Sequence, residues 1–320
     1  NVSEHPLDRV CEELARLVRE FPDRLTLAST GGPVTGDDAA DQAVWQNNTK
    51  KIEAAGAMGI EYSLSCPQGG DGTHGDIVAQ DPVLTAKIID WVMQISDPQI
   101  PKLFKLTGAV TAIYPIISAV KAVLDKYPDK KAGITLANTF PCLAFRDKEG
   151  AVWDEGVIVG MSGEAVLPIS YLSLARACNM GVTVSGNGGA MNYLDAANFL
   201  ALGASTVQFC TIAEKYGYGI IDELKLGLSH LLEAKKIPSV KDLIGIAQPH
   251  AITDFMDLPK KTKNSTLERE LCVHCGNCTR CPYLAITLDD ELLPVIDKDK
   301  CVGCSLCTKL CFAGALYMSQ

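Results

Sequence analysis

Residues 272–281 read C-V-H-C-G-N-C-T-R-C, and residues 301–311 read C-V-G-C-S-L-C-T-K-L-C. These two stretches hold eight of the 13 cysteines of the 320-residue chain. In each stretch, three cysteines are separated by two residues, and a fourth cysteine closes the run. Thiols that recur at such short, regular intervals indicate a metal-binding module.

The repeated spacing is that of a bacterial ferredoxin with two iron–sulfur clusters. The first three cysteines of a run bind one cluster, and the fourth cysteine reaches across to the other cluster. We therefore predict two [4Fe–4S] clusters in a small α+β domain. The predicted ligands are Cys272, Cys275, Cys278 and Cys311 for the first cluster, and Cys281, Cys301, Cys304 and Cys307 for the second.

Two details depart from the usual ferredoxin pattern. Two residues rather than three separate Cys278 from Cys281, and Phe312 follows Cys311 where a proline is usual. Structural zinc is the alternative, because paired C-x-x-C units also form zinc ribbons. A C-x-x-C-x-x-C-x-x-C run does not present four good tetrahedral corners, which favours iron–sulfur clusters. We interpret His274 as a neighbour of the cluster or a solvated residue rather than a ligand.

Composition and charge narrow the class of protein. The chain is 47% hydrophobic, which is typical of a well-cored globular protein. Its net charge of −9 argues against nucleic acid as a partner, because phosphate binding needs a basic face. No apolar run is long enough to span a membrane, and no signal peptide is recognisable. The cysteines fit a reducing compartment, so we expect a cytoplasmic protein.

Short apolar segments alternate with amphipathic helical segments through residues 1–247, which predicts right-handed βαβ units and a parallel sheet. Apolar residues at helical spacing predict a helix over residues 7–20. Asp81 and Asn192 are expected to begin two further helices. The predicted strands are Leu25–Ser29, Ile60–Ser65, Leu103–Thr107, Ala132–Asn138, Val182–Gly186 and Thr206–Ile212.

Six strands do not close a (β/α)₈ barrel, which needs eight. Either the sheet is open, or two strand–helix units precede residue 1. Residues 248–267 are polar and contain two prolines, which predicts a linker. We therefore expect a barrel domain at residues 1–247, a linker at 248–267 and a ferredoxin-like domain at 268–320.

Residues suited to a flavin site follow the predicted strand ends, where parallel barrels carry their chemistry. Cys66 begins a glycine-rich loop and is either an acid–base residue or a small buried thiol. Lys105 either faces an anion in the barrel mouth or reaches solvent. The glycines of residues 185–189 allow a phosphate to approach the backbone, although they could be plain turn residues. Without a G-x-G-x-x-G motif, they favour FMN over a dinucleotide.

Several short motifs occur in a recognisable order. They are L-S-C-P at 64–67, Q-D-P at 80–82, K-L-T at 105–107, N-T at 138–139, S-G at 162–163, G-G at 188–189 and the eight-cysteine tail. In combination they resemble the FMN and iron–sulfur subunit of bacterial NAD-dependent dihydropyrimidine dehydrogenases, within the dihydroorotate dehydrogenase superfamily. The resemblance covers essentially the whole chain.

The resemblance implies a TIM barrel with FMN at the carboxyl ends of the strands, and the first two strand–helix units before residue 1. The implied FMN contacts are Lys105, Asn138, Ser162, Gly163, Gly188, Gly189, Cys210 and Thr211. The implied substrate contacts are Ser63, Ser65, Asn138 and Thr139. Cys66 matches the family's catalytic thiol, which protonates one carbon of a pyrimidine C=C bond while reduced flavin gives hydride to the other. The chain departs from the family at Ser63, where the family carries an asparagine that binds the pyrimidine.

The implied function is an oxidoreductase subunit that reduces an activated C=C bond of a pyrimidine-like ring. Electrons are expected from a partner subunit with FAD and an NAD(P)H site, because this sequence has no dinucleotide motif and clusters relay single electrons. Such an enzyme would be a hetero-oligomer. Three alternatives remain: a dihydroorotate dehydrogenase-like oxidation, an electron-transfer subunit without its own substrate, which Ser63 favours, and a tRNA-modifying flavin reductase, which the acidic charge disfavours.

Overall fold

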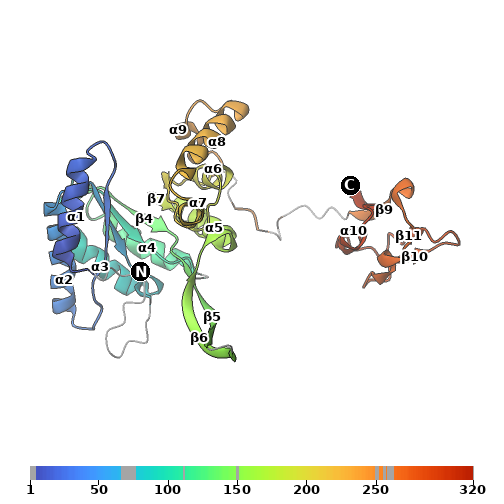
Figure 1. Ribbon diagram of the computed structural model, residues 1–320, viewed down its shortest axis with the longest axis horizontal. Helices are drawn as coiled ribbons and strands as arrows, with labels where there is room; N and C mark the ends of the chain where they lie inside the picture. Colours follow the sequence, from blue (N-terminus) through green and yellow to red (C-terminus); the bar gives the residue numbers. More distant parts are fainter. Residues whose placement is uncertain are drawn as a thin grey trace. The chain divides into compact units, whose positions relative to one another are not determined.

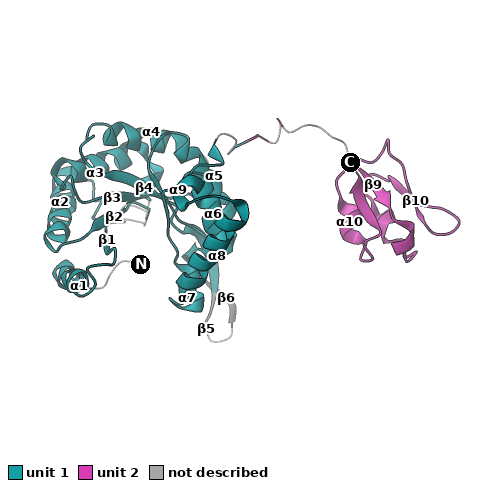
Figure 2. Ribbon diagram, turned by 90° about the horizontal axis from the view of Figure 1, so that it is seen from above, with its two compact units in different colours: residues 1–252 teal, residues 253–320 magenta. Residues whose placement is uncertain are grey.

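The computed structural model describes residues 5–65, 77–110, 112–148, 151–248, 252–254, 257 and 263–319. They belong to two compact units, Asn1–Ile252 and Thr253–Gln320 (Figure 2). The elements of the first unit are α1 (Leu7–Glu20), β1 (Leu27–Thr30), α2 (Asp38–Ala54), β2 (Gly59–Ser63), η1 (Val78–Gln80), α3 (Pro82–Ile95), β3 (Lys102–Lys105), α4 (Ile113–Leu124), β4 (Ala132–Leu136), β5 (Phe140–Lys148), β6 (Ala151–Met161), η2 (Gly163–Val166), α5 (Leu167–Cys178), β7 (Val184–Gly186), α6 (Tyr193–Ala201), β8 (Thr206–Val207), α7 (Thr211–Tyr216), α8 (Ile220–Lys235) and α9 (Val240–Leu243).

A parallel sheet lies at the centre of the first unit. Its six described strands follow the order β1-β2-β3-β4-β7-β8, which is the chain order of the six predicted strands. Figure 1 labels two of them, β4 and β7. The prediction of a parallel βαβ sheet is therefore confirmed. The last strand is shorter than predicted: it ends at Val207, and Thr211 already begins helix α7.

Helices α2, α3 and α4 form an arc along one side of the sheet (Figure 2). Between them and the strands lies an aromatic stack of fully buried side chains. The ring centroids of Tyr62 and Phe104 are 5.2 Å apart, and those of Trp45 and Tyr62 are 6.4 Å apart. The hydroxyl of Tyr62 lies 2.9 Å from that of Thr49, so its polar end is also satisfied. This outer side of the sheet is the hydrophobic core.

Both predicted helix starts are confirmed. The Asp81 carboxylate accepts hydrogen bonds from the N–H groups of Val83 and Leu84, and Pro82 occupies the first turn of α3. The Asn192 side chain likewise accepts from the first turn of α6. A side-chain oxygen at this position satisfies amides that have no partner within the helix.

A long antiparallel hairpin, β5–β6, was not predicted. It pairs Phe140 with Met161 at its base, so residues 139 and 162 lie next to one another although 23 positions separate them. The sequence carried a signal for it. Val157, Ile158 and Val159 have high β-propensity, and residues 147–150 read D-K-E-G, a turn-like composition.

The second unit contains two antiparallel strand pairs, β9–β12 and β10–β11. Its elements are β9 (Asn264–Leu267), η5 (Arg269–Leu271), η6 (Asn277–Arg280), β10 (Ile286–Leu288), β11 (Pro294–Ile296), α10 (Leu306–Leu310) and β12 (Leu316–Ser319). Strand β9 occupies the end of the segment that we assigned to the linker, so the folded part begins by Asn264. No helix in the described residues combines the length and apolar character needed to cross a membrane.

Candidate functional site

The inner face of the sheet carries a row of polar side chains. Strand pairing aligns Ser63, Lys105, Thr135, Ser185 and Thr206, one from each of five neighbouring strands. Successive side chains of a strand alternate between the two faces of a sheet. The aromatic stack therefore faces the helices, and this row faces the opposite, inner side. A polar inner wall suits a bound polar ligand better than the apolar layers that fill an ordinary barrel.

A buried carboxylate, Glu61, contacts side chains from three other parts of this inner face. Its Oε1 lies 3.4 Å from the Lys105 Nζ. Its Oε2 accepts hydrogen bonds from the Thr135 hydroxyl at 2.7 Å and from the Gln208 amide at 2.8 Å. Gln208 follows β8, whereas Glu61 lies on β2, and three strands separate these two in the sheet. The contact therefore spans the concave side of the sheet.

Sequence reasoning missed Glu61, Thr135 and Gln208. A usable signal was present in strand β2, where polar residues recur at every second position from Glu61 to Ser65 among apolar neighbours. This alternation marks one polar face. Gln208 gave no such signal, because its side chain reaches the network only through the curvature of the sheet.

The predicted substrate residues lie at the carboxyl ends of β2 and β4. The Asn138 side-chain amide donates a 2.7 Å hydrogen bond to the hydroxyl of Ser65, which is 5% exposed. The Asn138 side-chain oxygen, Oδ1, accepts a hydrogen bond from the backbone N–H of Thr139 at 2.9 Å. Ser63 lies directly opposite Lys105 in the sheet register. Cys66, the predicted catalytic thiol, lies outside the described residues.

Several of the residues predicted to contact FMN also come together. The Thr211 hydroxyl lies 3.0 Å from that of Ser162. A Cβ atom at Gly189 would lie 2.6 Å from the carbonyl oxygen of Gly163, so only glycine fits there. Gly188 and Gly189 have φ angles of 107° and 97°, in the region that favours glycine. Two hydroxyls thus stand beside a closely packed glycine backbone.

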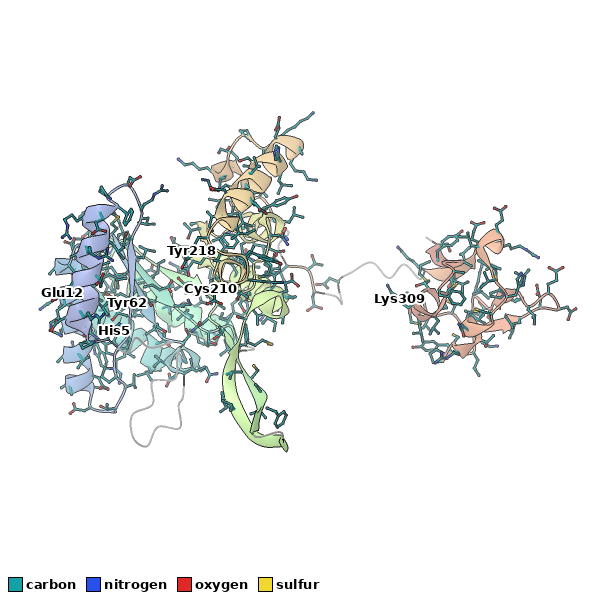
Figure 3. All side chains as sticks on the ribbon, viewed as in Figure 1. His5, Glu12, Tyr62, Cys210, Tyr218 and Lys309 are labelled. Carbon is teal, nitrogen blue, oxygen red and sulfur yellow. The ribbon has the colours of Figure 1, made fainter. Side chains whose placement is uncertain are left out.

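Cys210 lies directly before Thr211, at the start of α7. Figure 3 labels this residue. Its sulfur is 3.5 Å from the Glu214 carboxylate. Burial, and then the Glu214 carboxylate, raises the pKa of the Cys210 thiol, while the charge of Lys105 acts in the opposite direction. Cys210 is therefore a neutral thiol near Lys105.

The donor set of the first unit fits FMN. Hydroxyls and glycine amides suit a phosphate, and the Lys105 ammonium suits an electron-rich ring edge. Lys105, the two glycines at 188–189 and Thr211 lie at or after the ends of β3, β7 and β8 of the sheet, and Ser162 and Gly163 follow the hairpin strand β6. The carboxyl ends of the strands are the position of ligand sites in parallel barrels.

The cysteines of the second unit surround two cavities. The first is lined by Cys272, Cys275, Cys278 and Cys311, and the second by Cys281, Cys301, Cys304 and Cys307. In each cavity the fourth cysteine comes from the other run, as the crossover pattern predicts. Among the described residues, no three His, Cys, Asp or Glu side chains converge tightly enough for a single ion. The thiols instead line two separate cavities, four to each, and their assignment as cluster ligands stays a prediction.

Two family models match the chain. Residues 34–232 match the dihydroorotate dehydrogenase family, and residues 294–317 match the 4Fe-4S binding domain. The first match covers strands β2 to β8 of the parallel sheet, and the second covers the second cysteine run.

Three relatives illustrate the range of similarity. The NAD-dependent dihydropyrimidine dehydrogenase subunit PreA of Escherichia coli K12 is 29% identical over 98% of this chain and 68% of its own length. The chloroplastic dihydropyrimidine dehydrogenase (NADP⁺) of Arabidopsis thaliana is 26% identical over 84% of this chain and 63% of its own length. The catalytic subunit of dihydroorotate dehydrogenase B (NAD⁺) of Pyrococcus furiosus is 29% identical over 62% of this chain and 63% of its own length.

The matches give the chain its cofactor class, FMN together with [4Fe–4S] clusters, and make it an oxidoreductase. The family model spans more than half of the sequence and the parallel half-barrel that carries the polar inner face. This chain belongs to the dihydroorotate dehydrogenase family.

Proposed function

We propose that this chain is a dihydropyrimidine dehydrogenase-type subunit that reduces the C=C bond of a pyrimidine-like ring. One observation carries the proposal. The match to the E. coli dihydropyrimidine dehydrogenase subunit extends over 98% of the chain, and so through both units, whereas the P. furiosus dihydroorotate dehydrogenase relative matches 62%. A match to dihydropyrimidine dehydrogenase subunits that includes the iron–sulfur unit favours this function over a dihydroorotate dehydrogenase.

The paired Ser65 and Asn138 support a planar polar ring as substrate. A pyrimidine presents alternating carbonyl and N–H groups along its edge. An amide both donates and accepts hydrogen bonds, and a hydroxyl does the same. The 2.7 Å bond between Asn138 and Ser65 fixes the orientation of the amide before a ring arrives, which lowers the cost of ordering it on binding.

Bound FMN supplies hydride transfer to one carbon of the ring. The chain's own contribution is to hold the two partners and to deliver a proton to the other carbon. Cys66 is our candidate for this proton donor, because it directly follows Ser65 and an ordinary thiol, with a pKa of about 8.5, is protonated at neutral pH. Lys105, held by Glu61, is the positioning cation beside the flavin.

We further propose that electrons come from a second chain that binds a nicotinamide and FAD. Support comes from the relatives: one is named a subunit of an NAD-dependent enzyme, and another the catalytic subunit of an NAD⁺-linked one. The two cluster cavities provide one-electron carriers for such a transfer. Thiolate-ligated clusters persist in reducing compartments, so we propose the cytoplasm as the location.

An anaerobic titration tests the substrate class without the partner. The purified holoprotein is reduced with dithionite, and uracil, thymine or orotate is then added while the flavin absorbance is followed. We expect uracil or thymine to reoxidise the flavin and to gain two hydrogens, as measured by mass spectrometry. Reoxidation by orotate alone would instead indicate a dihydroorotate dehydrogenase-like enzyme.

Substitution of Cys66 distinguishes an enzyme that reduces a pyrimidine from a subunit that only carries electrons. Cys66→Ala should slow the reoxidation by about 10²–10⁴-fold, and Cys66→Ser should keep a little activity. Cys142→Ala is the matched control, since Cys142 lies on the β5–β6 hairpin and takes no part in the proposed site. The second candidate function is an electron-transfer subunit. Ser63 favours it, because the serine side chain is shorter than the asparagine side chain that the family carries at this position. This candidate predicts no reoxidation by any pyrimidine, whatever residue stands at position 66.

A further inference from the structure

The two cluster cavities match each other in the exposure of their cysteines. The middle cysteine of each run, Cys275 or Cys304, is exposed. The third, Cys278 or Cys307, is buried, with 7% and 9% exposure. The remaining four are intermediate. Solvent exposure is one of the main influences on the reduction potential of a cluster. Because the cysteines of the two cavities are exposed alike, solvent exposure of the thiols should affect the reduction potentials of the two clusters equally.

Ser265 makes the two cavities different. It lies on β9, is 2% exposed and lines the second cavity. Its Oγ is 3.2 Å from the sulfur of Cys307. Within the described part of the chain, no other proposed ligand sulfur has a side-chain hydroxyl at hydrogen-bond distance. A ligating thiolate carries no proton, so in the loaded protein the Ser265 hydroxyl is the donor.

The equivalent position in the first cavity holds a proline. Ser265 stands seven residues before Cys272, the first cysteine of its run, and Pro294 stands seven residues before Cys301. Pro294 begins β11 and lines the first cavity as Ser265 lines the second. Proline has neither a hydroxyl nor an N–H group, so it cannot donate a hydrogen bond. At this position the second cavity therefore has a hydroxyl donor, and the first cavity has none.

We propose that the Ser265 hydroxyl raises the reduction potential of the second cluster above that of the first, so that a single electron entering the pair resides on the second cluster. Reduction adds one negative charge, which is shared with the ligand sulfurs. A donor aimed at a sulfur stabilises the reduced cluster more than the oxidised one, because hydrogen bonds to more negative acceptors are stronger. The proposal rests on the two ligand sets given above.

The test is a potentiometric titration of the full chain with its clusters, followed by EPR spectroscopy, with dithionite supplying one electron per cluster. The parent should show two midpoints. In Ser265→Ala the higher midpoint should fall while the lower stays. At fixed solution potential, the reduced-to-oxidised ratio should drop about three- to tenfold, where tenfold corresponds to about 59 mV for a one-electron couple.

Two further variants keep the result specific. Thr266→Ala removes a hydroxyl from the next position of β9, on the opposite face of the strand, and should leave both midpoints unchanged. Pro294→Ser places a hydroxyl beside the first cavity and should raise the lower midpoint.

Unchanged midpoints in a Ser265→Ala protein that keeps both clusters would overturn the proposal, as would an equal shift in Thr266→Ala. If Ser265→Ala does not assemble its clusters, Pro294→Ser decides, and the absence of any rise would refute the proposal. Iron and sulfide analysis of the parent protein tests the two ligand sets separately from the proposal about Ser265. About eight of each per chain are expected for two clusters, whereas about four would refute the ligand sets themselves.

Discussion

The two units of this chain are stabilised in different ways. The first has a large hydrophobic core in which Trp45, Tyr62 and Phe104 are completely buried. The main core cluster of the second consists of Cys278, Ile286, Cys307 and Leu316, so half of its members are proposed cluster ligands. Small domains bury too little apolar surface to be stable without additional cross-links or metals. The first unit is therefore built on packing, and the second is built around its clusters.

Removal of iron should give the largest effect that separates the units. Anaerobic chelation of the clusters should unfold the second unit, because metal binding supplies the folding free energy of small cysteine-rich domains. Amide hydrogen exchange should become fast across residues 264–319 and stay slow in the core strands of the first unit. Retained protection in β9 and β12 after complete loss of iron would show that the second unit folds by packing alone.

A core truncation gives the converse experiment. Phe104→Ala removes a ring that is fully buried and stacked on Tyr62, and should lower the free energy of unfolding of the first unit by about 3–5 kcal/mol. Tryptophan fluorescence reports on this unit alone, since the three tryptophans at 45, 91 and 153 all belong to it. Iron content should not change. Phe312→Ala is the matched control: this ring is 74% exposed, so its removal should cost almost nothing.

The same contrast explains what the sequence could predict. Local rules were sufficient for the six parallel strands, the helix starts at Asp81 and Asn192, and the sorting of eight cysteines into two sets. Each rests on spacing or on a capping side chain. The Glu61–Gln208 contact could not be predicted, because it depends on the curvature that brings the far strands together. The β5–β6 hairpin could have been, since its turn and its β-branched residues were visible.

The paired charges at the two ends of β3 allow a more specific test. Lys105 meets Glu61 at the carboxyl end, and Lys102 meets Glu53 at the amino end, 3.1 Å away. Glu61→Ala and Glu53→Ala each remove the carboxylate partner of a largely buried ammonium, and each should lower the stability of the first unit by about 1–3 kcal/mol. Only Glu61→Ala should also weaken FMN binding, by about tenfold, because only Lys105 lies at the ligand end of the sheet.

Equilibrium titration of the apoprotein with FMN, followed by flavin fluorescence, measures this difference directly. Equal FMN affinity in the two variants would separate the Glu61 network from the flavin site and leave it a purely structural feature. Glu61→Gln sharpens the comparison further. It keeps an oxygen for Thr135 but removes the charge that balances Lys105, so a loss of affinity in this variant would point to the charge rather than to packing.

The smallest predicted effect concerns a cysteine of the first unit. Cys178 ends α5 and is 8% exposed, and burial raises the pKa of its thiol from 9.0 to about 11. In the unfolded chain this thiol loses its proton near pH 9, whereas in the folded chain it keeps the proton until about pH 11. Within this window the native state binds more protons than the unfolded state, so the free energy of unfolding must fall as the pH rises. The contribution is fully present below pH 9.

Cys178→Ala should reduce this fall to what the raised pKa values of the Cys11 and Cys210 thiols still contribute. We expect a cost of about 1 kcal/mol at neutral pH for the small cavity that remains. Denaturant unfolding followed by tryptophan fluorescence should be compared between pH 9 and 10, because burial of Tyr171, whose pKa is raised to about 12, adds a loss of the same sign above pH 10. The second unit should not share the effect, since its proposed ligands act as thiolates and higher pH does not protonate them. A parent and an alanine variant that lose stability equally between pH 9 and 10 would show that the Cys178 thiol does not titrate differently on folding. The pH dependence of stability would then show no contrast between a buried neutral cysteine in the first unit and metal-binding cysteines in the second.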